Sequence, residues 1–452
     1  TGDGREESIG GFAGTWLCDT QTKRQNGNIL TDLRLYPLPD ADGSILRLQL
    51  DIPEYSEDFL PNFRQGDMVM LYERNSELDT VTSKQFFRCT IEEIQAERLW
   101  LRLSYKQRNA RVFHTNSPYA VEPGYMDAAF GQAYSGLFSF LTAPRERKEL
   151  LLGMREPSVN LSVRLNRHYP DEDISRIVLK AKQAEDYFLL IGPPGTGKTS
   201  VALKAMVEEF LSDSPEKTIL LMAYTNRAVD EICHMLSTIT PAPEYIRIGQ
   251  ELNCQAEYRP HLMKHVIKDA VSRKEIYERL SPVRLFTGTI SSLCNQTELF
   301  NLKAIDVAII DEASQVLEPQ MLPLLCAKTT VNKGDYNLNR LAIGKFILIG
   351  DHKQLPAVVV QPQDSSKVSE ESLHKIGLTD CRNSLFERLH HLNRIQGTEG
   401  IVEMLRKQGR MHPAISEFVN RYFYNGRLDI VPMPHQTEPL PFKDRTEDNA
   451  WT

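Results

Sequence analysis

The chain has 452 residues, of which 41% are hydrophobic and 25% are charged, and its formal net charge is −7. This composition is typical of a soluble globular protein of roughly two to four domains, and it excludes a globally basic surface, so any nucleic-acid site must be local. There is no signal peptide and no apolar run long enough to cross a membrane. The seven cysteines form no C-x-x-C pair, so we expect reduced thiols. The expected location is the cytoplasm, or the nucleus in a eukaryote.

Residues 1–120 are predicted to form a β-rich barrel with an N-terminal extension. Leu46, Leu48 and Leu50 alternate with polar residues, and further apolar runs lie at 68–72 and 86–91. Short strands separated by turns are typical of a small antiparallel barrel. Residues 121–170 then change to helical spacing, which predicts a helical stalk or linker.

Residues 171–395 alternate between apolar strands and helices. Strands are expected at 187–191, 219–223, 285–286, 307–310 and 346–349. Because these runs lack polar alternation, they indicate a mostly parallel α/β sheet with helices on both faces. Residues 396–452 are predicted to begin a second, truncated α/β domain, with a strand at 401–405, a helix at 413–424 and a polar tail from Lys443.

The first expected strand leads into a glycine-rich loop and then a helix. This loop matches the phosphate-binding pattern G-x-x-x-x-G-K-[ST] at every position, with Gly192, Pro193, Pro194, Gly195, Thr196, Gly197, Lys198 and Thr199. Its backbone N–H groups would surround phosphate oxygens, and Ser200 would continue the site into the helix. Lys198 would reach the β- and γ-phosphates, and the hydroxyl of Thr199 would bind Mg²⁺. The pattern therefore predicts a nucleotide site.

Two further motifs follow buried strands. Asp311 and Glu312 come directly after the run 307–310, where a carboxylate can hold Mg²⁺ and its neighbour can orient the attacking water. Without the other motifs, such a pair of acids is as often part of an ordinary turn as part of a metal site. Gln354 lies in the loop after 346–349 and could hydrogen-bond a γ-phosphate oxygen.

Polar residues at other strand ends are candidates for contact with a nucleic-acid backbone or with the nucleotide from across a cleft. Thr225 and Asn226 lie where a strand becomes a helix, and Thr289 belongs to a hydroxyl-rich loop of a kind that is usually just a turn. Arg410 precedes the last helix, and its guanidinium could stabilise charge on the γ-phosphate in the transition state.

Taken in order, these segments resemble motifs I, Ia, Ic, II, III and IV of the Upf-like branch of superfamily 1B helicases. They read GPPGTGKT, AYTNRAVD, GTISS, DEASQ, GDHKQLP and QGRMHP. The resemblance covers roughly residues 45–430 and implies two RecA-like domains with ATP between them, a barrel inserted as domain 1B, and 5′→3′ movement on single-stranded DNA or RNA. It also implies backbone contacts for Thr225, Asn226 and Thr289, and a trans-cleft role for Arg410.

The chain departs from the family in three places. It has Gly409 where the family usually has a tyrosine, which puts the base contact there in doubt. The usual adenine-reading glutamine has no clear match after Asn166, and Gln183 is a poor substitute. No segment resembles motifs V and VI, and no carboxylate–lysine pattern identifies a nuclease, although the parent protein could have a fused or associated one.

The expected function is therefore an ATP-dependent 5′→3′ helicase or translocase that is inactive or weak as this chain alone. The alternative is a fragment that only binds ATP and nucleic acid, because the second arginine of the family is missing. An unrelated phosphate-loop enzyme such as a kinase would leave the Gln354 loop unexplained.

Overall fold

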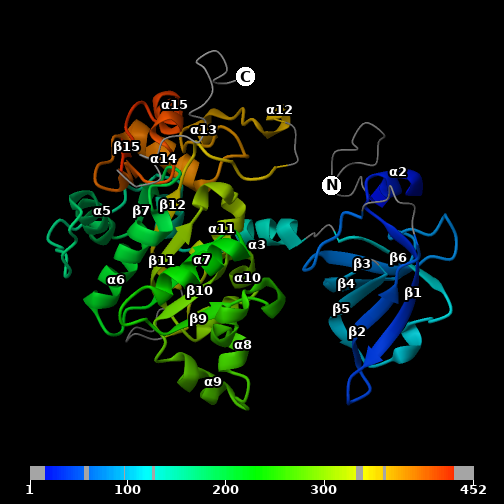
Figure 1. Ribbon diagram of the computed structural model, residues 1–452. Coiled ribbons are helices and arrows are strands. Elements are labelled where there is room, and N and C mark those ends of the chain that lie inside the picture. Colours follow the sequence, from blue (N-terminus) through cyan, green and yellow to red (C-terminus); the bar gives the residue numbers. More distant parts are fainter. Residues whose placement is uncertain are drawn as a thin grey trace, which may run out of the picture. The chain divides into compact units, whose positions relative to one another are not determined.

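The computed structural model describes residues 16–54, 61–95, 97–124, 128–331, 340–359 and 363–431. The chain folds as two units that divide at residue 130 (Figure 1). The polar tail expected from Lys443 lies outside the described residues. Among the described helices, none is long and apolar enough to span a membrane.

The first unit contains a closed barrel. Its neighbouring strands are antiparallel and follow the order β1-β2-β5-β4-β3-β6. They are β1 (Leu30–Pro39), β2 (Ile45–Asp51), β3 (Met68–Glu73), β4 (Phe86–Ile94), β5 (Arg98–Gln107) and β6 (Pro118–Pro123). Leu48 and Leu50 are fully buried inside the barrel, as their alternation with polar residues predicts. Because β6 pairs with both β1 and β3, the barrel continues past the boundary expected at residue 120.

The second unit is built on a parallel sheet. Its order, in the part of the chain that the structure describes, is β13-β7-β12-β11-β8-β10-β9. The strands are β7 (Tyr187–Ile191), β8 (Ile219–Ala223), β9 (Tyr245–Ile248), β10 (Leu285–Thr289), β11 (Ile305–Asp311), β12 (Ile343–Gly350) and β13 (Val402–Met404). All its pairings are parallel, and β7 and β8 are buried along their whole length. The α/β fold expected from the apolar runs is confirmed.

The strand expected at 401–405 lies in this same sheet. β13 pairs with β7, and the N–H of Leu405 donates to the carbonyl of Ile191 over 2.9 Å. It therefore extends the parallel sheet of the second unit and does not begin a new sheet. A separate two-stranded sheet follows, formed by β14 (Lys407–Gln408) and β15 (Asp429–Ile430). A second RecA-like domain from residue 396 stays a prediction.

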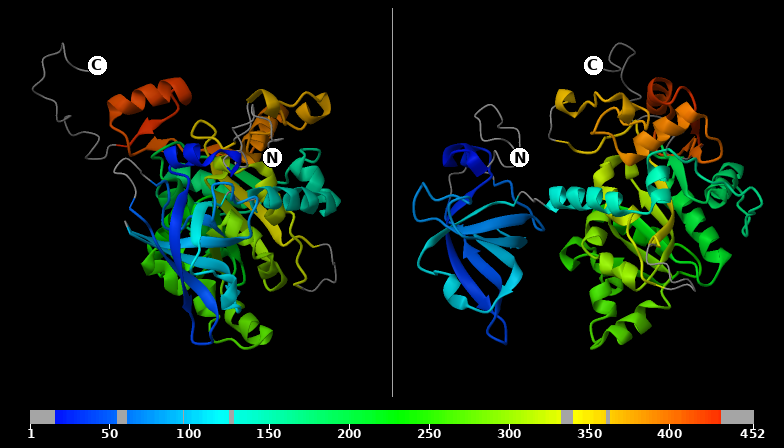
Figure 2. Two further views of the ribbon diagram at one scale, coloured as in Figure 1. Left: turned by 90° about the vertical axis from the view of Figure 1, so that its right-hand side faces the viewer. Right: turned by 180° about the vertical axis from the view of Figure 1, so that it is seen from behind.

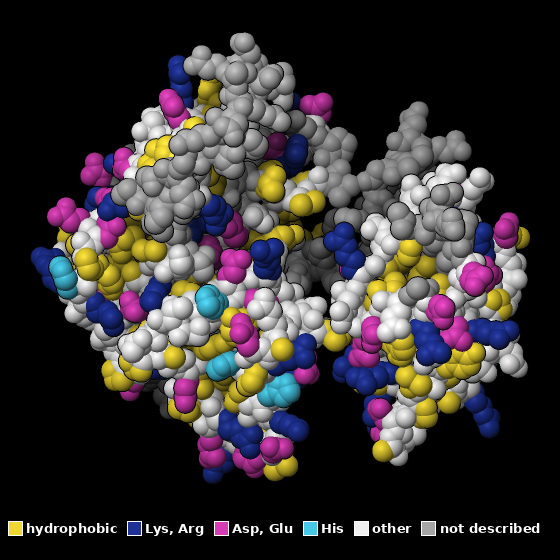
Figure 3. All heavy atoms as spheres, viewed as in Figure 1, with side chains coloured by type: hydrophobic (Ala, Val, Ile, Leu, Met, Phe, Trp, Pro, Cys, Tyr) yellow, Lys and Arg dark blue, Asp and Glu magenta, His cyan; other side chains and the backbone are white. Residues whose placement is uncertain are grey.

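Helices flank the parallel sheet on both sides (Figures 1 and 2). The α-helices of the described chain are α2 (Thr20–Gln25), α3 (Ala128–Thr142), α4 (Arg145–Leu151), α5 (Glu172–Gln183), α6 (Lys204–Asp213), α7 (Asn226–Ser237), α8 (Met263–Val266), α9 (Arg273–Leu280), α10 (Ile290–Cys294), α11 (Glu318–Leu325), α12 (Gln363–Ser366), α13 (Glu371–His374), α14 (Leu385–Gln396) and α15 (Pro413–Phe423). In the face shown in Figure 3, acidic and basic side chains are interspersed over the second unit, in keeping with the net charge.

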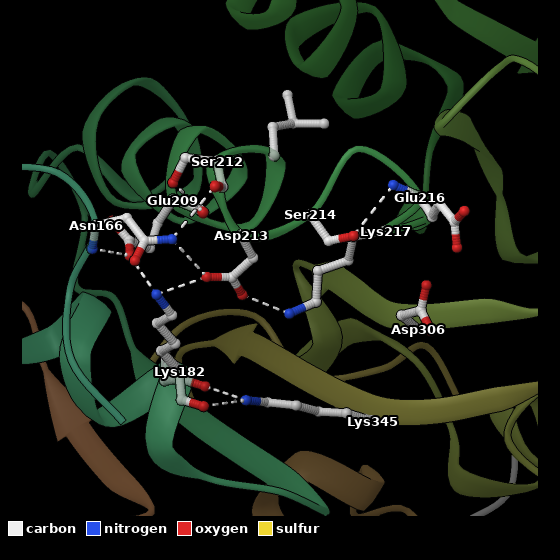
Figure 4. A network of polar contacts seen from close by, with 12 residues as sticks. Asn166, Lys182, Glu209, Ser212, Asp213, Ser214, Glu216, Lys217, Asp306 and Lys345 are labelled. Atoms are coloured by element: carbon white, nitrogen blue, oxygen red, sulfur yellow. Dashed lines mark hydrogen bonds and ion pairs between the residues drawn. The ribbon is translucent and has the colours of Figure 1, made fainter. Parts of the chain in front are cut away.

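A buried charge network holds α5 against α6 (Figure 4). The ammonium of Lys182 lies 2.7 Å from Glu209 and 2.6 Å from Asp213, and the side chains of Lys182 and Glu209 are only 7% and 0% exposed. Glu209 also accepts hydrogen bonds from the N–H of Asn166 and the hydroxyl of Tyr169. Burial alone would lower the pKa of Lys182, but its bonds to the two carboxylates outweigh burial and raise it.

Replacing Lys182 with methionine should destabilise the second unit by about 3–5 kcal/mol, because the charge of Glu209 would stay buried without its partner. The unfolding midpoint in urea, followed by circular dichroism, measures this loss. Lys180→Met is the matched control on the same helix, since Lys180 pairs with Glu403 and is 34% exposed. That variant should lose less than about 1 kcal/mol. Equal losses in the two variants would contradict the assignment of Lys182 to a buried network.

Candidate nucleotide-binding site

The phosphate loop joins β7 to a π-helical turn at Lys198–Leu203, which continues into α6. Gly195 and Gly197 have φ angles of 74° and 76°, in the left-handed region that glycine adopts without strain. The hydroxyl of Thr196 donates to the carbonyl of Pro193 over 2.8 Å and closes the turn. The structure therefore has the strand, loop and helix order expected from the sequence, with the helix beginning at Lys198.

The structure brings the predicted metal ligands together. Asp311 ends β11, and Thr199 follows the loop after β7. The Thr199 hydroxyl donates to the buried Asp311 carboxylate over 2.6 Å. Burial raises the pKa of Asp311, and the Thr199 hydrogen bond partly offsets that rise.

These two oxygen ligands suit Mg²⁺, a hard cation that binds through few protein groups and takes its other ligands from phosphates and water. Residues that fit the ion are therefore present, with the remaining coordination left for a nucleotide.

Glu312 lies beside the lysine of the loop. The Lys198 ammonium is 3.0 Å from a Glu312 carboxylate oxygen, and the Gln315 amide donates to the other oxygen over 3.3 Å. Glu312 has a φ of 53°, so its side chain leaves the strand in a direction that an extended residue would not allow. The carboxylate thus lies next to the group expected to bind the β- and γ-phosphates.

Gln354 lies against the start of the same loop. Its amide Nε2 donates to the Asp351 carboxylate over 2.7 Å and is 3.5 Å from the carbonyl of Gly192. Asp351 comes directly after β12, which lies between β7 and β11. The carboxyl ends of three neighbouring strands therefore present Lys198, Asp311 and Gln354 at one edge of the sheet, where ligands bind in open α/β sheets.

The segment around Arg410 also contacts the phosphate loop. The N–H of Gly409 donates to the carbonyl of Gly195 over 2.9 Å. A Cβ added at Gly195 would lie 2.4 Å from the Cβ of Arg410, so only glycine fits there. The Gln408 side chain accepts from the N–H groups of Arg410 and Met411 and fixes this turn. The backbone and Cβ of Arg410 thus lie beside the loop, and its role toward the γ-phosphate stays a prediction.

The three candidate strand contacts lie elsewhere on the sheet edge. Thr289 is the last residue of β10. Thr225 follows the neighbouring strand β8 and precedes Asn226, the first residue of α7. Both threonine hydroxyls accept helix-capping hydrogen bonds, from Ala228 and Ser292, and Thr289 is buried. Capping explains both threonines without a bound strand, so their contact with nucleic acid stays a prediction.

The two residues considered in place of an adenine-reading glutamine both have protein partners. Gln183 donates to the carbonyl of Val163, and Asn166 donates to Ser212 and Asp213 at the C-terminal end of α6 (Figure 4). Because α6 continues the helix that begins at the phosphate loop, Asn166 lies at the opposite end of that helix from the loop.

One residue beside Gln354 had no sequence signal. The hydroxyl of Tyr424 donates to Asp351 over 2.6 Å, and no motif indicated that tyrosine.

Two family models match segments of the second unit. One described as an AAA domain matches residues 175–360, and a second with the same description matches residues 381–450. The two matches contain the phosphate loop, Asp311 and Gln354 in the first case and Arg410 in the second.

Curated relatives match the chain at low to moderate identity. The DNA replication ATP-dependent helicase/nuclease JHS1 of Arabidopsis thaliana is 31% identical over 57% of this chain and 16% of its own length. The protein DNA2 of Mus musculus, with the same description, is 27% identical over 64% of this chain and 25% of its own. Its counterpart dna2 of Schizosaccharomyces pombe is 28% identical over 68% of this chain and 20% of its own.

This chain thus spans 16% to 25% of the length of these three relatives. The matches to the two AAA domains and to the helicase/nucleases confirm the resemblance of the chain to the Upf-like superfamily 1B helicases, the helicase/nuclease branch included.

Proposed function

We propose that the protein to which this chain belongs is an ATP-dependent helicase that moves 5′→3′ on single-stranded DNA. One observation carries the ATPase part: Lys198, the Thr199–Asp311 pair and Gln354 meet at one edge of the parallel sheet, with Arg410 beside the loop. The relatives are named DNA replication helicase/nucleases, which favours DNA over RNA as the polymer.

In this proposal the residues at the phosphate loop act on the nucleotide, on its metal ion or on the attacking water. The loop N–H groups and Lys198 bind the phosphates, and Thr199 and Asp311 hold Mg²⁺, which when bound neutralises charge on the β- and γ-phosphates. Glu312 orients the attacking water, Gln354 contacts the γ-phosphate, and Arg410 stabilises the charge that develops there. Thr225, Asn226 and Thr289 contact the backbone of the nucleic-acid strand.

A nuclease fused to or associated with the helicase also belongs to this proposal, because the relatives are named helicase/nucleases.

The steady-state ATPase rate of the full-length protein tests this function, measured with single-stranded DNA, with single-stranded RNA and without either. DNA should stimulate hydrolysis more than RNA, and the apparent affinity for DNA should fall steeply with salt because phosphate contacts release counterions. Unwinding of a duplex with only a 5′ or only a 3′ tail determines direction. Nucleotide binding without stimulated hydrolysis would instead favour a module that only binds ATP and nucleic acid.

A further inference from the structure

Asp351 connects two parts of the second unit that lie far apart in sequence. One of its carboxylate oxygens, Oδ2, accepts a hydrogen bond from the Gln354 amide over 2.7 Å and another from the Tyr424 hydroxyl over 2.6 Å. The other oxygen accepts from the N–H of Lys353, and the Asp351 N–H donates to the Ser314 hydroxyl. Asp351 is 1% exposed, so the three bonds to its oxygens fix a buried carboxylate in one orientation, and the fourth holds its backbone.

Tyr424 reaches this carboxylate from the end of α15. It is 6% exposed, whereas Tyr422, on the same helix, is 65% exposed. The turn after the helix is closed by Asn420, whose amide group donates to the carbonyl of Leu428 and whose oxygen accepts from the Leu428 N–H. Burial, together with the nearby carboxylate, raises the pKa of Tyr424, so its hydroxyl stays protonated and donates.

The segment that ends at Tyr424 contacts the nucleotide site at a second point. Gly409, at its beginning, donates to the carbonyl of Gly195 in the phosphate loop. The segment 408–424 therefore makes two contacts at the site. Gly409, next to Arg410, contacts the phosphate loop, and Tyr424 contacts Asp351, the hydrogen-bond partner of Gln354. The two contacts connect the expected trans-acting arginine and the expected γ-phosphate sensor through one short segment.

We propose that Tyr424 is a positioning residue that acts through Asp351 to orient Gln354 toward the γ-phosphate. The reason is that two donors share one oxygen. While the Tyr424 hydroxyl occupies Oδ2, that oxygen holds the Gln354 amide less strongly, and the amide turns more readily to a phosphate. When Tyr424 withdraws, Asp351 retains Gln354. This inference rests on the proposed role of Gln354 and adds a residue that links it to the Arg410 segment.

Tyr424→Phe in the full-length protein tests the link, because it removes one oxygen and keeps the buried ring. The readout is the ratio of affinities for a non-hydrolysable ATP analogue, adenylyl imidodiphosphate, and for ADP, since only the former has a γ-phosphate. The ratio should fall about tenfold, the effect expected for one hydrogen bond to a charged group. Tyr422→Phe, with its exposed hydroxyl on the same helix, should leave the ratio unchanged. Equal ratios in the two variants would overturn the proposal.

A double variant separates positioning from a general loss of packing. If Tyr424 acts through Gln354, then Tyr424→Phe should have almost no further effect in a Gln354→Ala background, because coupled residues are not additive. A full tenfold drop in that background would also overturn the proposal.

Strand-stimulated hydrolysis is measured in parallel. If the wild-type protein lacked stimulated hydrolysis but the variants gave the expected affinity ratios, the helicase function would be refuted and the link from Tyr424 to Gln354 would stand. If hydrolysis were stimulated but the ratios were unchanged, the link would be refuted and the helicase function would stand.

Discussion

Lys198→Ala should lower the ATP turnover of the full-length protein by at least about a thousandfold. The ammonium lies at the start of the helix that follows the phosphate loop, 3.0 Å from Glu312, so the substitution removes the only lysine that the described loop offers to the β- and γ-phosphates. It also leaves Glu312 without its cation, and the unpaired carboxylate should repel the nucleotide. Both turnover and the affinity for ATP should therefore fall, as measured by steady-state hydrolysis and by equilibrium titration.

Lys204→Ala is the matched control for this experiment. Lys204 begins α6, in continuation of the same helix, but its ammonium donates to the carbonyl of Thr238 and is exposed. Its loss should change turnover by less than about twofold, because surface charges contribute little. If Lys198→Ala hydrolysed ATP at the rate of this control, the assignment of the nucleotide site would be wrong.

Glu312→Gln should separate binding from hydrolysis. The amide keeps the size of the side chain but cannot take a proton from water, so turnover should fall by about 10²–10⁴-fold, the usual contribution of a general base. Lys198 would lose its partner and be freed for phosphate, so ATP should bind at least as tightly as in the wild type. A single-turnover assay with a parallel binding measurement gives both quantities.

For this second variant the comparison is Glu298→Gln, an exposed acid in another part of the same domain. It should leave both hydrolysis and binding unchanged. A Glu312→Gln protein that lost binding in proportion to turnover would show that the carboxylate supports the architecture of the loop and does not activate water.

Most of the site was predictable because its residues come at the ends of strands. A parallel sheet places the carboxyl ends of all its strands along one edge, so an apolar run followed by Lys198, Asp311 or Gln354 already indicates where each side chain lies. The barrel was predictable for a similar reason, since Leu48 and Leu50 alternate with polar residues around one core.

The remaining features depend on contacts that no local pattern encodes. The Tyr424–Asp351 hydrogen bond joins residues 73 apart, and nothing about a tyrosine at a helix end distinguishes it from the exposed Tyr422. The run that forms β13 was identified as a strand, but its pairing with β7 depends on the whole topology of the sheet. The capping roles of Thr225 and Thr289 also look the same in sequence as contacts with a nucleic acid.

The pairing of β13 with β7 has a mechanical consequence for Arg410. Only Leu405 and Arg406 separate β13 from β14, and Leu405 is itself hydrogen-bonded to the last residue of the strand that precedes the phosphate loop. The guanidinium is thus attached to the edge of the sheet by a very short tether. If Arg410 has the proposed role, this tether would set the effective concentration of its guanidinium at the nucleotide. Insertion of a few flexible residues after Leu405 would therefore weaken the contribution of Arg410 even though every side chain of the site remained in place.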